Sequence, residues 1–252
     1  MPIYPQRGLH GQVVRAVGQR IVRGDLRPGE GIDVEALERE FGVSRTVVRE
    51  SLRVLAAKGL VDARPRRGTF VRDRSDWSLL DPDLLHWRYE GRLDEGFLDN
   101  LAEVRAIVEP AGARLAALRC DPDDLAALTN AMEGMRRAGE DDRQVIASDV
   151  GFHRALLGSS HNELLERMEV IIEVGMQALD RMVCRVQNFR NSLPGHQAVL
   201  DAVTAGNPDH AEAAMRALLD QAWQDIRAVS RGDTGSAESA DPPGPPPRQR
   251  NG

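Results

Sequence analysis

The chain lacks the features that mark secreted proteins, membrane proteins and thiolate metal sites. Its 252 residues include only two cysteines, Cys120 and Cys184, and neither belongs to a CxxC pair. Such cysteines are typically small core residues of a reducing compartment. No run of about 18 apolar residues is present, so no membrane span is expected. The first residues, "MPIYPQRGLHGQ", lack the apolar core of a signal peptide, and we therefore expect a cytoplasmic protein.

Acidic residues exceed basic ones overall, but the two signs are unevenly distributed. The formal net charge is −6, yet residues 1–75 hold 15 Lys+Arg against 9 Asp+Glu. The remaining residues hold 18 basic against 30 acidic side chains. A basic front end attached to an acidic remainder suggests a nucleic-acid-binding module joined to a unit of another kind.

The basic front end has the pattern of three helices followed by a hairpin. Apolar residues at helical spacing predict a helix over 8–23, and Asp33 can cap a second one that ends at Gly42. Ser44 can cap a third, which Gly59 ends. Two short alternating stretches, 60–64 and 69–72, flank a "PRRG" turn and predict paired strands. This order is that of a winged helix-turn-helix.

The third predicted helix, "SRTVVRESLRVLAAKGL" (44–60), has two distinct faces. Val48, Leu52 and Leu55 repeat at helical spacing and are predicted to be buried. Arginines follow one another at single-turn spacing on another face, at Arg45, Arg49 and Arg53. A solvated charged face is the commoner explanation of such a row. Its place in a helix-turn-helix instead indicates the helix that enters a DNA major groove.

The rest of the chain predicts an all-α bundle, so the fold class is mainly α. Residues 76–90 have the composition of a linker with a short helix. Helical periodicity then runs from Asp94 to about Arg231. Breaks bearing Pro, Gly, Asn or Asp separate helices over 94–119, 122–138, 142–158, 161–185, 192–205 and 208–230. We therefore expect a DNA-binding domain at 1–75, a helical effector-binding and dimerisation domain at 76–231, and a disordered Pro/Gly/Ser-rich tail at 232–252.

Several stretches resemble the GntR family of bacterial transcription regulators. They are "IVRGDLRPGE", "FGVSRTVVRESLRVLAAKGLV" and "RRGTFV". The remainder resembles the FadR-type branch with its helical FCD effector domain, through "EVRAIVEPAGARLAA", "DVGFHRALL", "HNELLERM" and "GHQAVLDAV". Within that branch, "LLDPDLLHW" and "EVRAIVEPA" are most similar to repressors of galactonate operons. The resemblance implies a DNA-binding repressor of a catabolic operon, not an enzyme.

The resemblance implies that Arg45 and Arg49 enter the major groove, where a guanidinium can bridge O6 and N7 of guanine. Thr46 would bond a phosphate or a base, and Arg53 would touch phosphate or nothing. Arginines flanking Gly68 would reach the minor groove and backbone, the alternative being a solvated hairpin. The predicted set is Arg45, Thr46, Arg49, Arg53, Arg66, Arg67, Gly68 and Thr69. Val47 and Glu35 replace the family's usual proline and basic residue, which leaves the operator sequence open.

Asp149 and His153 lie four residues apart, on one face of a predicted helix, where together they can chelate a divalent transition metal. His196 could close a third side. An isolated Asp–His pair is more often a simple hydrogen bond, but the resemblance implies a metal site, often zinc. The family's usual fourth ligand, a histidine, aligns with Leu218 here. The metal would then have three protein ligands and open positions, the competing outcome being its loss.

Arg105 matches a family position that faces the effector cavity, and a guanidinium is a natural partner for a carboxylate. The alternative is an ion pair with Glu109 one turn later. The resulting hypothesis is a homodimer on a palindromic operator, released by a small organic or sugar acid. Two alternatives stay open: a DNA-binding dimer whose helical domain only dimerises, and a metal-dependent hydrolase. No HExxH or GxSxG motif supports the hydrolase.

Overall fold

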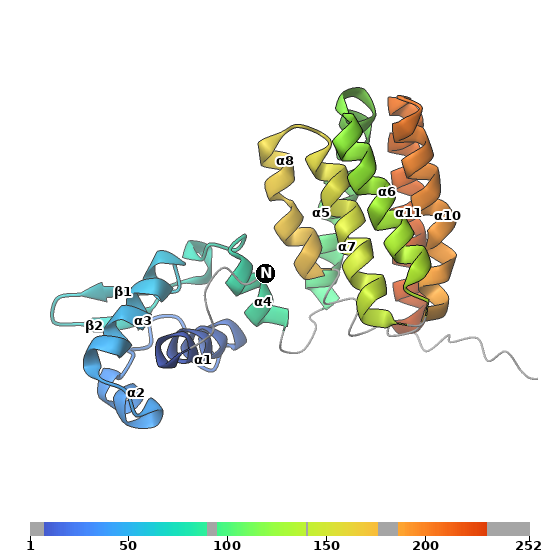
Figure 1. Cartoon of the computed structure of the whole chain (residues 1–252). Helices are drawn as coiled ribbons and strands as arrows, with labels where there is room; N and C mark the ends of the chain where they lie inside the picture. The colour runs from blue at the N-terminus through green and yellow to red at the C-terminus, as the bar shows by residue number, and fades with distance from the viewer. Residues whose placement is uncertain (1–7, 90–94, 140, 176–185, 231–252) are drawn as a thin grey trace, which may run out of the picture.

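The computed structural model describes residues 8–89, 95–139, 141–175 and 186–230. The tail predicted at 232–252 lies outside these described residues. Figure 1 shows a small N-terminal lobe bearing a hairpin and a larger lobe of long helices. The predicted fold class, a winged helix-turn-helix followed by an all-α bundle, is confirmed.

The N-terminal lobe contains the three helices and the wing. They are α1 (Leu9–Arg23), α2 (Val34–Phe41), α3 (Arg45–Ala57), β1 (Val61–Arg64) and β2 (Gly68–Val71). The two strands pair antiparallel, with Val61 opposite Val71 at the end of the hairpin nearest α3. The apolar faces of the helices meet in one core that includes the predicted Val48, Leu52 and Leu55.

Local signals set the helix ends in this lobe. The Asp33 carboxylate accepts a hydrogen bond from the Ala36 N–H at 3.0 Å and so caps α2. Gly42 then takes a left-handed conformation, with φ of 61°, that ends the helix. Ser44 occupies the N-cap position of α3 as predicted, although its side chain makes no capping hydrogen bond.

The predicted linker contains a short 3-10 turn (Arg74–Asp76) and helix α4 (Pro82–Tyr89), which packs against α1. Trp87 of α4 is only 2% exposed and belongs to the core of the N-terminal lobe. Gly18 of α1 makes room for it, because a Cβ there would lie 2.3 Å from the Trp87 ring. Helix α4 is therefore part of the packing of the N-terminal lobe.

Charged side chains attach α4 to the end of α3. Lys58 Nζ lies 2.7 Å from Asp83 Oδ2 and 2.9 Å from Asp81 Oδ2, and both Lys58 and Asp83 are nearly buried. On its other side, Leu85 of α4 belongs to an apolar cluster with Leu101 and Ile171 of the larger lobe. Helix α4 thus contacts both lobes.

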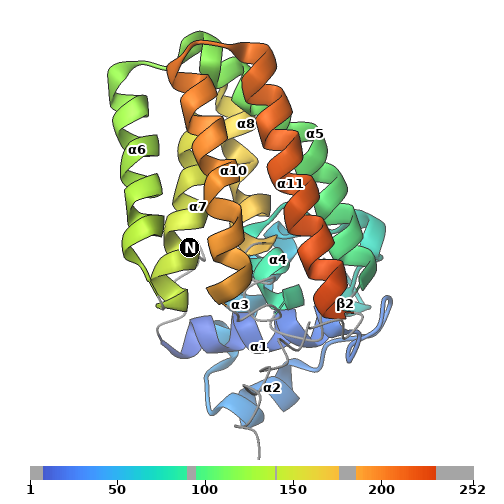
Figure 2. The ribbon, with the colours of Figure 1, turned by 90° about the vertical axis from the view of Figure 1, so that its right-hand side faces the viewer.

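The larger lobe is a bundle in which α5 packs on α11, α10 on α11 and α6 on α7 (Figure 2). Its helices are α5 (Glu95–Arg119), α6 (Pro122–Arg137), α7 (Asp142–Gly158), α8 (Glu163–Arg167), α10 (Val186–Thr204) and α11 (Pro208–Ser230). Small and apolar side chains of five of these helices form the core. None of the described helices is long and apolar enough to cross a membrane.

Two predicted helix boundaries in the larger lobe are wrong. The helix expected over 161–185 is interrupted after α8, and helical structure resumes at residues 169–175. The break expected around Pro194 is absent, since α10 runs through that proline. A proline forfeits one helical hydrogen bond, a loss that packing of α10 against α11 and α6 can offset. His196 therefore lies within a helix instead of at the start of one.

Candidate DNA interface and metal centre

Helix α3 presents its predicted DNA-reading face to solvent. The side chains of Arg45 and Arg53 are 62% and 78% exposed, and Arg49 is also exposed. Arg53 pairs with Glu50 at 2.6 Å, which ties it to its own helix. Arg45 makes only a long contact, 3.9 Å, with Glu35 of α2. The first half of α3 is therefore the part whose cations are most available for a ligand.

The wing holds its two predicted arginines differently. Arg66 is at the tip with φ of 66°, a left-handed conformation rare outside glycine. Arg67 is drawn back, with its guanidinium 3.7 Å from the Phe70 ring centroid and a long hydrogen bond to the Gly29 carbonyl. Gly68 is exposed and Thr69 is half-buried. Arg66 is the freer of the two cations.

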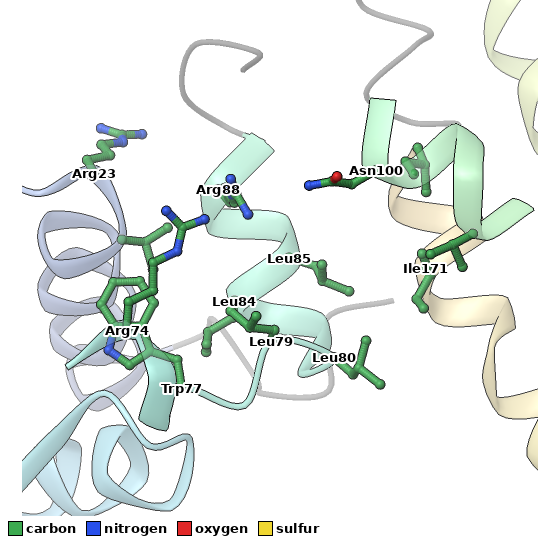
Figure 3. A pocket seen from close by; sticks show the side chains of 13 residues that line it. Arg23, Arg74, Trp77, Leu79, Leu80, Leu84, Leu85, Arg88, Asn100 and Ile171 are labelled. Carbon is green, nitrogen blue, oxygen red and sulfur yellow. The ribbon is translucent and has the colours of Figure 1, made fainter. Parts of the chain in front are cut away.

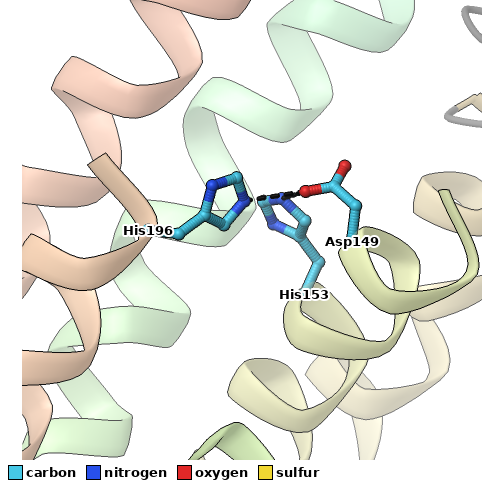
Figure 4. Close-up of side chains that lie close together, drawn as sticks. All are labelled: Asp149, His153 and His196. Carbon is cyan, nitrogen blue, oxygen red and sulfur yellow. Dashed lines mark ion pairs between the residues drawn. The ribbon is translucent and has the colours of Figure 1, made fainter. Parts of the chain in front are cut away.

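The structure brings the three predicted metal ligands together inside the bundle (Figure 4). Asp149 Oδ1 of α7 lies 2.8 Å from His196 Nε2 of α10 and 3.9 Å from His153 Nε2. Both histidines are 2% exposed. Residues from two helices thus converge on one buried point.

Each imidazole is held through its other ring nitrogen. His196 Nδ1 lies 3.0 Å from the backbone oxygen of Ser192, which can only accept, so Nδ1 carries the proton. His153 Nδ1 lies 2.5 Å from Glu109 Oε2, an ion-pair contact in which the carboxylate oxygen can only accept. Both Nε2 atoms are therefore left facing the Asp149 carboxylate.

This donor set fits a divalent transition metal. Asp149 Oδ1 is buried and makes no hydrogen bond within the described part of the chain, despite the nitrogens close to it. An orphaned buried carboxylate oxygen is costly unless a cation satisfies it. Two imidazole nitrogens and one carboxylate oxygen are ligands that zinc and other divalent first-row transition metals accept.

The predicted effector anchor, Arg105 of α5, borders the group formed by Asp149, His153 and His196. It is 7% exposed, its Nε lies 2.5 Å from Glu109 Oε1, and its Nη2 lies 3.5 Å from His153 Nε2. The intrahelical pair with Glu109 is therefore present. Burial would raise the pKa of Glu109, but Arg105 and His153 outweigh it and lower that pKa to about 2. For Asp149, too, burial raises the pKa, while His196, His153 and Arg105 lower it below its usual value.

Glu109 is the residue of this site that sequence reasoning weighed only as a partner of Arg105. It is fully buried, and its second oxygen reaches His153 on a different helix. The signal available in the sequence was an acidic residue within the small and apolar stretch "AIVEPAGA" of α5. The partner could not be found there, because α5 and α7 meet only in the folded bundle.

Leu218, which the resemblance aligns with a fourth metal ligand, is an apolar residue close to the Asp149, His153 and His196 group. Leu218 of α11 is 4% exposed and packs on Gly195, where an added Cβ would lie 3.0 Å from Leu218 Cδ1. It is thus next to the residue that precedes His196. An apolar side chain fills this place and supplies no fourth protein ligand.

The described residues also form a pocket between the lobes and a second acid–histidine group. A pocket of about 650 Å³ between the lobes is lined by leucines, by Arg23, Arg74 and Arg88, and by Asn100 and Ile171 on the opposite side (Figure 3). A second acid–histidine group, Asp121, Asp124 and His161, is largely exposed. Asp121 and Asp124 already cap α6, which accounts for that group structurally.

Family models match both lobes in chain order. The model described as bacterial regulatory proteins of the gntR family matches residues 9–71, and the FCD domain model matches residues 100–221. The galactonate operon transcriptional repressor of Escherichia coli is 32% identical to this chain over an alignment that covers 87% of this chain and 97% of the repressor. The chain belongs to the GntR family and carries an FCD domain. It is a DNA-binding transcriptional regulator and not an enzyme, which excludes the hydrolase alternative.

Other relatives agree with this GntR/FCD assignment. The regulator LutR of Bacillus subtilis is 32% identical over 79% of this chain and 92% of its own. Among solved structures, Lar, which controls the Listeria monocytogenes agr system, has a TM-score of 0.65 at 21% identity, covering 90% of this chain and 99% of that one. At that identity the structural likeness supports the fold alone.

Proposed function

We propose that this GntR/FCD regulator represses a catabolic operon and is released from DNA by a small carboxylate or sugar acid. The observation that carries the proposal is the buried convergence of Asp149, His153 and His196 beside the Arg105 guanidinium. A buried carboxylate, two buried imidazoles and a buried guanidinium thus lie side by side in the helical core. Together they form a site for an anionic ligand, with a divalent metal, most simply zinc, held by the three ligands.

The two ends of the Arg105 guanidinium have different tasks in this proposal. Its Nε is taken by Glu109, which leaves the outer nitrogens for a ligand carboxylate. Its Nη2 is 3.5 Å from a metal-facing imidazole nitrogen, so one ligand oxygen could contact both the guanidinium and the metal. The metal, when bound, supplies a Lewis acid for a carboxylate or hydroxyl oxygen. Leu218 keeps a protein ligand from taking that position.

Arg105 also borders a pocket beside the site. It lines a pocket of about 430 Å³ between α5 and α11, together with Leu219 and Trp223. A pocket of that volume lies within the usual range for small ligands. Its mixed lining suits a ligand with hydroxyl groups and one negative charge.

The DNA side of the proposal is a homodimer on a palindromic operator. One α3 helix and one wing cover few base pairs. Sequence-specific recognition of an operator therefore needs two half-sites related by two-fold symmetry. Arg45, Thr46 and Arg49 would meet base edges, and Arg66, Gly68 and Thr69 the adjacent backbone and minor groove. Arg67 and Arg53, which are held within the lobe, would add contacts to phosphate. Binding would weaken steeply with salt.

The test combines metal analysis with operator release. Purified wild type is expected to contain about one transition metal per chain. His153→Ala should lose it, and His161→Ala, which removes a histidine outside the cluster, should retain it. Affinity for an operator selected from random DNA is then measured with and without a hexonate such as galactonate. A tenfold loss of DNA affinity corresponds to about 1.4 kcal/mol of coupling.

Each result bears on a separate part of the proposal. A wild type without metal contradicts the metal centre and leaves Arg105 as the anchor of any acid. Metal without a response to hexonates or smaller hydroxy acids contradicts the effector class. If neither metal nor acid binds, the helical domain is only a dimeriser.

A further inference from the structure

Glu109 contacts both parts of the proposed ligand site at once. Its Oε1 lies 2.5 Å from Arg105 Nε on the same helix, and its Oε2 lies 2.5 Å from His153 Nδ1 on α7. The side chain is fully buried. One carboxylate therefore serves the effector anchor with one oxygen and a metal ligand with the other.

The proton positions around Glu109 follow from the groups that face it. The Arg105 guanidinium can only donate, so Oε1 accepts from it. The same guanidinium places Nη2 3.5 Å from His153 Nε2, which orients a lone pair and not a proton at that nitrogen. The His153 proton then belongs on Nδ1, facing Oε2. Both contacts of Glu109 thus require it to be an acceptor.

The second histidine has an equivalent arrangement made from backbone. His196 Nδ1 faces the Ser192 carbonyl at 3.0 Å, one helical turn earlier in α10. That carbonyl can only accept, so it sets the His196 tautomer. His153 is held by a side chain that also contacts Arg105, so its orientation is linked to the anchor.

We propose that Glu109 is a positioning residue that fixes His153 with Nε2 toward the metal and links that ligand to Arg105. The inference rests on the proposed metal site and deepens it. Acceptors that hold the distal nitrogen of a metal-bound histidine typically change metal affinity about 10–100-fold when removed. An acid bound to Arg105 would affect the metal ligand His153 through the Glu109 carboxylate. By reciprocity, bound metal would order Arg105 through the same carboxylate.

The isosteric variant Glu109→Gln separates this role from mere packing. A glutamine has one acceptor oxygen and one donor nitrogen, whereas Arg105 and His153 both present N–H groups to residue 109. It can satisfy only one of them. In the Arg105→Met background the competing donor is gone, and the amide oxygen is free to accept from His153.

The first experiment is therefore a double-mutant cycle on zinc affinity, measured by competition with a chromophoric chelator. Glu109→Gln should weaken zinc binding about 10–100-fold in the wild-type background. The penalty should be clearly smaller in the Arg105→Met background. Glu133→Gln, at a half-exposed glutamate on α6, is the matched control and should change nothing. Equal penalties in the two backgrounds would show that Glu109 acts only through its charge and would overturn the proposal.

The second experiment reads the tautomer directly and needs no metal. Nitrogen NMR of histidine-labelled, chelator-treated protein should show His153 protonated on Nδ1 in the wild type, and a mixture in Glu109→Gln. His153→Gln assigns the signal. Dominant Nε2 protonation in the wild type would overturn the positioning role whether or not zinc binds. Absence of zinc from the wild type, with the predicted tautomer present, would refute the metal centre and leave the tautomer assignment standing.

Discussion

Replacing Gly18 by alanine tests how the linker helix α4 is attached to the DNA-binding lobe. The added Cβ would lie 2.3 Å and 2.6 Å from two ring carbons of Trp87, far inside the contact distance of about 3.5–4.0 Å. Trp87 is 2% exposed and has to move. Overpacking of this kind costs about 1–3 kcal/mol, and the gain in helix propensity offsets about 0.5–1 kcal/mol. We expect a net destabilisation of about 1–2 kcal/mol.

The matched control is Gly151→Ala in α7, where an added Cβ meets nothing within 4 Å. That variant should be stabilised by about 0.5–1 kcal/mol. Because both variants gain the same helix propensity, they should differ by the overpacking cost alone, about 1–3 kcal/mol. Urea unfolding followed by tryptophan fluorescence and circular dichroism measures both. A smaller side chain in Trp87→Leu should remove most of the Gly18→Ala penalty. Equal stability of the two alanine variants would refute the packing of Trp87 on Gly18.

The remaining predictions concern the DNA interface, the α4 ion pair and the metal centre. Arg49→Ala should weaken operator binding by about 1–3 kcal/mol in fluorescence anisotropy, and Arg53→Ala by much less, since Arg53 is paired within its helix; equal losses would contradict this. Burial lowers the pKa of Lys58, but its hydrogen bonds and attraction to Asp83 and Asp81 together outweigh burial and raise that pKa above its ordinary value. The ion pairs therefore stabilise the fold fully below about pH 10, and this stability is lost as pH rises through the raised pKa. Alkaline melting curves check this, and Lys58→Met should cost about 3–5 kcal/mol by leaving Asp83 buried and unpaired. Leu218→His should tighten zinc binding about tenfold or more and weaken the response to acids, because it fills the position left for the effector; unchanged zinc affinity would show that residue 218 lies out of reach.

The DNA-binding lobe could be predicted from sequence because its signals are local. Asp33, Gly42 and Gly59 sit at helix ends, and each acts through the backbone of its own neighbours. The buried face of α3 follows from spacing alone, and Val48 and Leu55 are fully buried as predicted. Short-range signals of this kind need no knowledge of the partner element.

The helical lobe was predicted less completely because tertiary packing overrides local signals there. Pro194 predicts a break, yet α10 continues through it while packed between neighbours. The same limit applies once in the DNA-binding lobe, where the role of Gly18 in α1 follows only when the opposing Trp87 is placed. In both cases the deciding atoms come from another element.

The metal cluster shows both situations within one site. Asp149 and His153 share a helical face by their spacing, which a sequence shows directly. The assignment of His196 to the same site rested on the family resemblance, because His196 lies far from Asp149 and His153 in the sequence. Glu109 required the structure, because only the fold brings its second oxygen to His153.

The most direct test of the metal centre is the location of the metal itself. Anomalous diffraction from crystals of the purified protein, recorded above and below the zinc edge, should give one peak per chain within the cluster. We predict that this peak is bounded by His153 Nε2, His196 Nε2 and Asp149 Oδ1, with Arg105 nearby. A cluster without anomalous signal in protein purified without chelators, or a peak at His161 instead, would contradict the central claim.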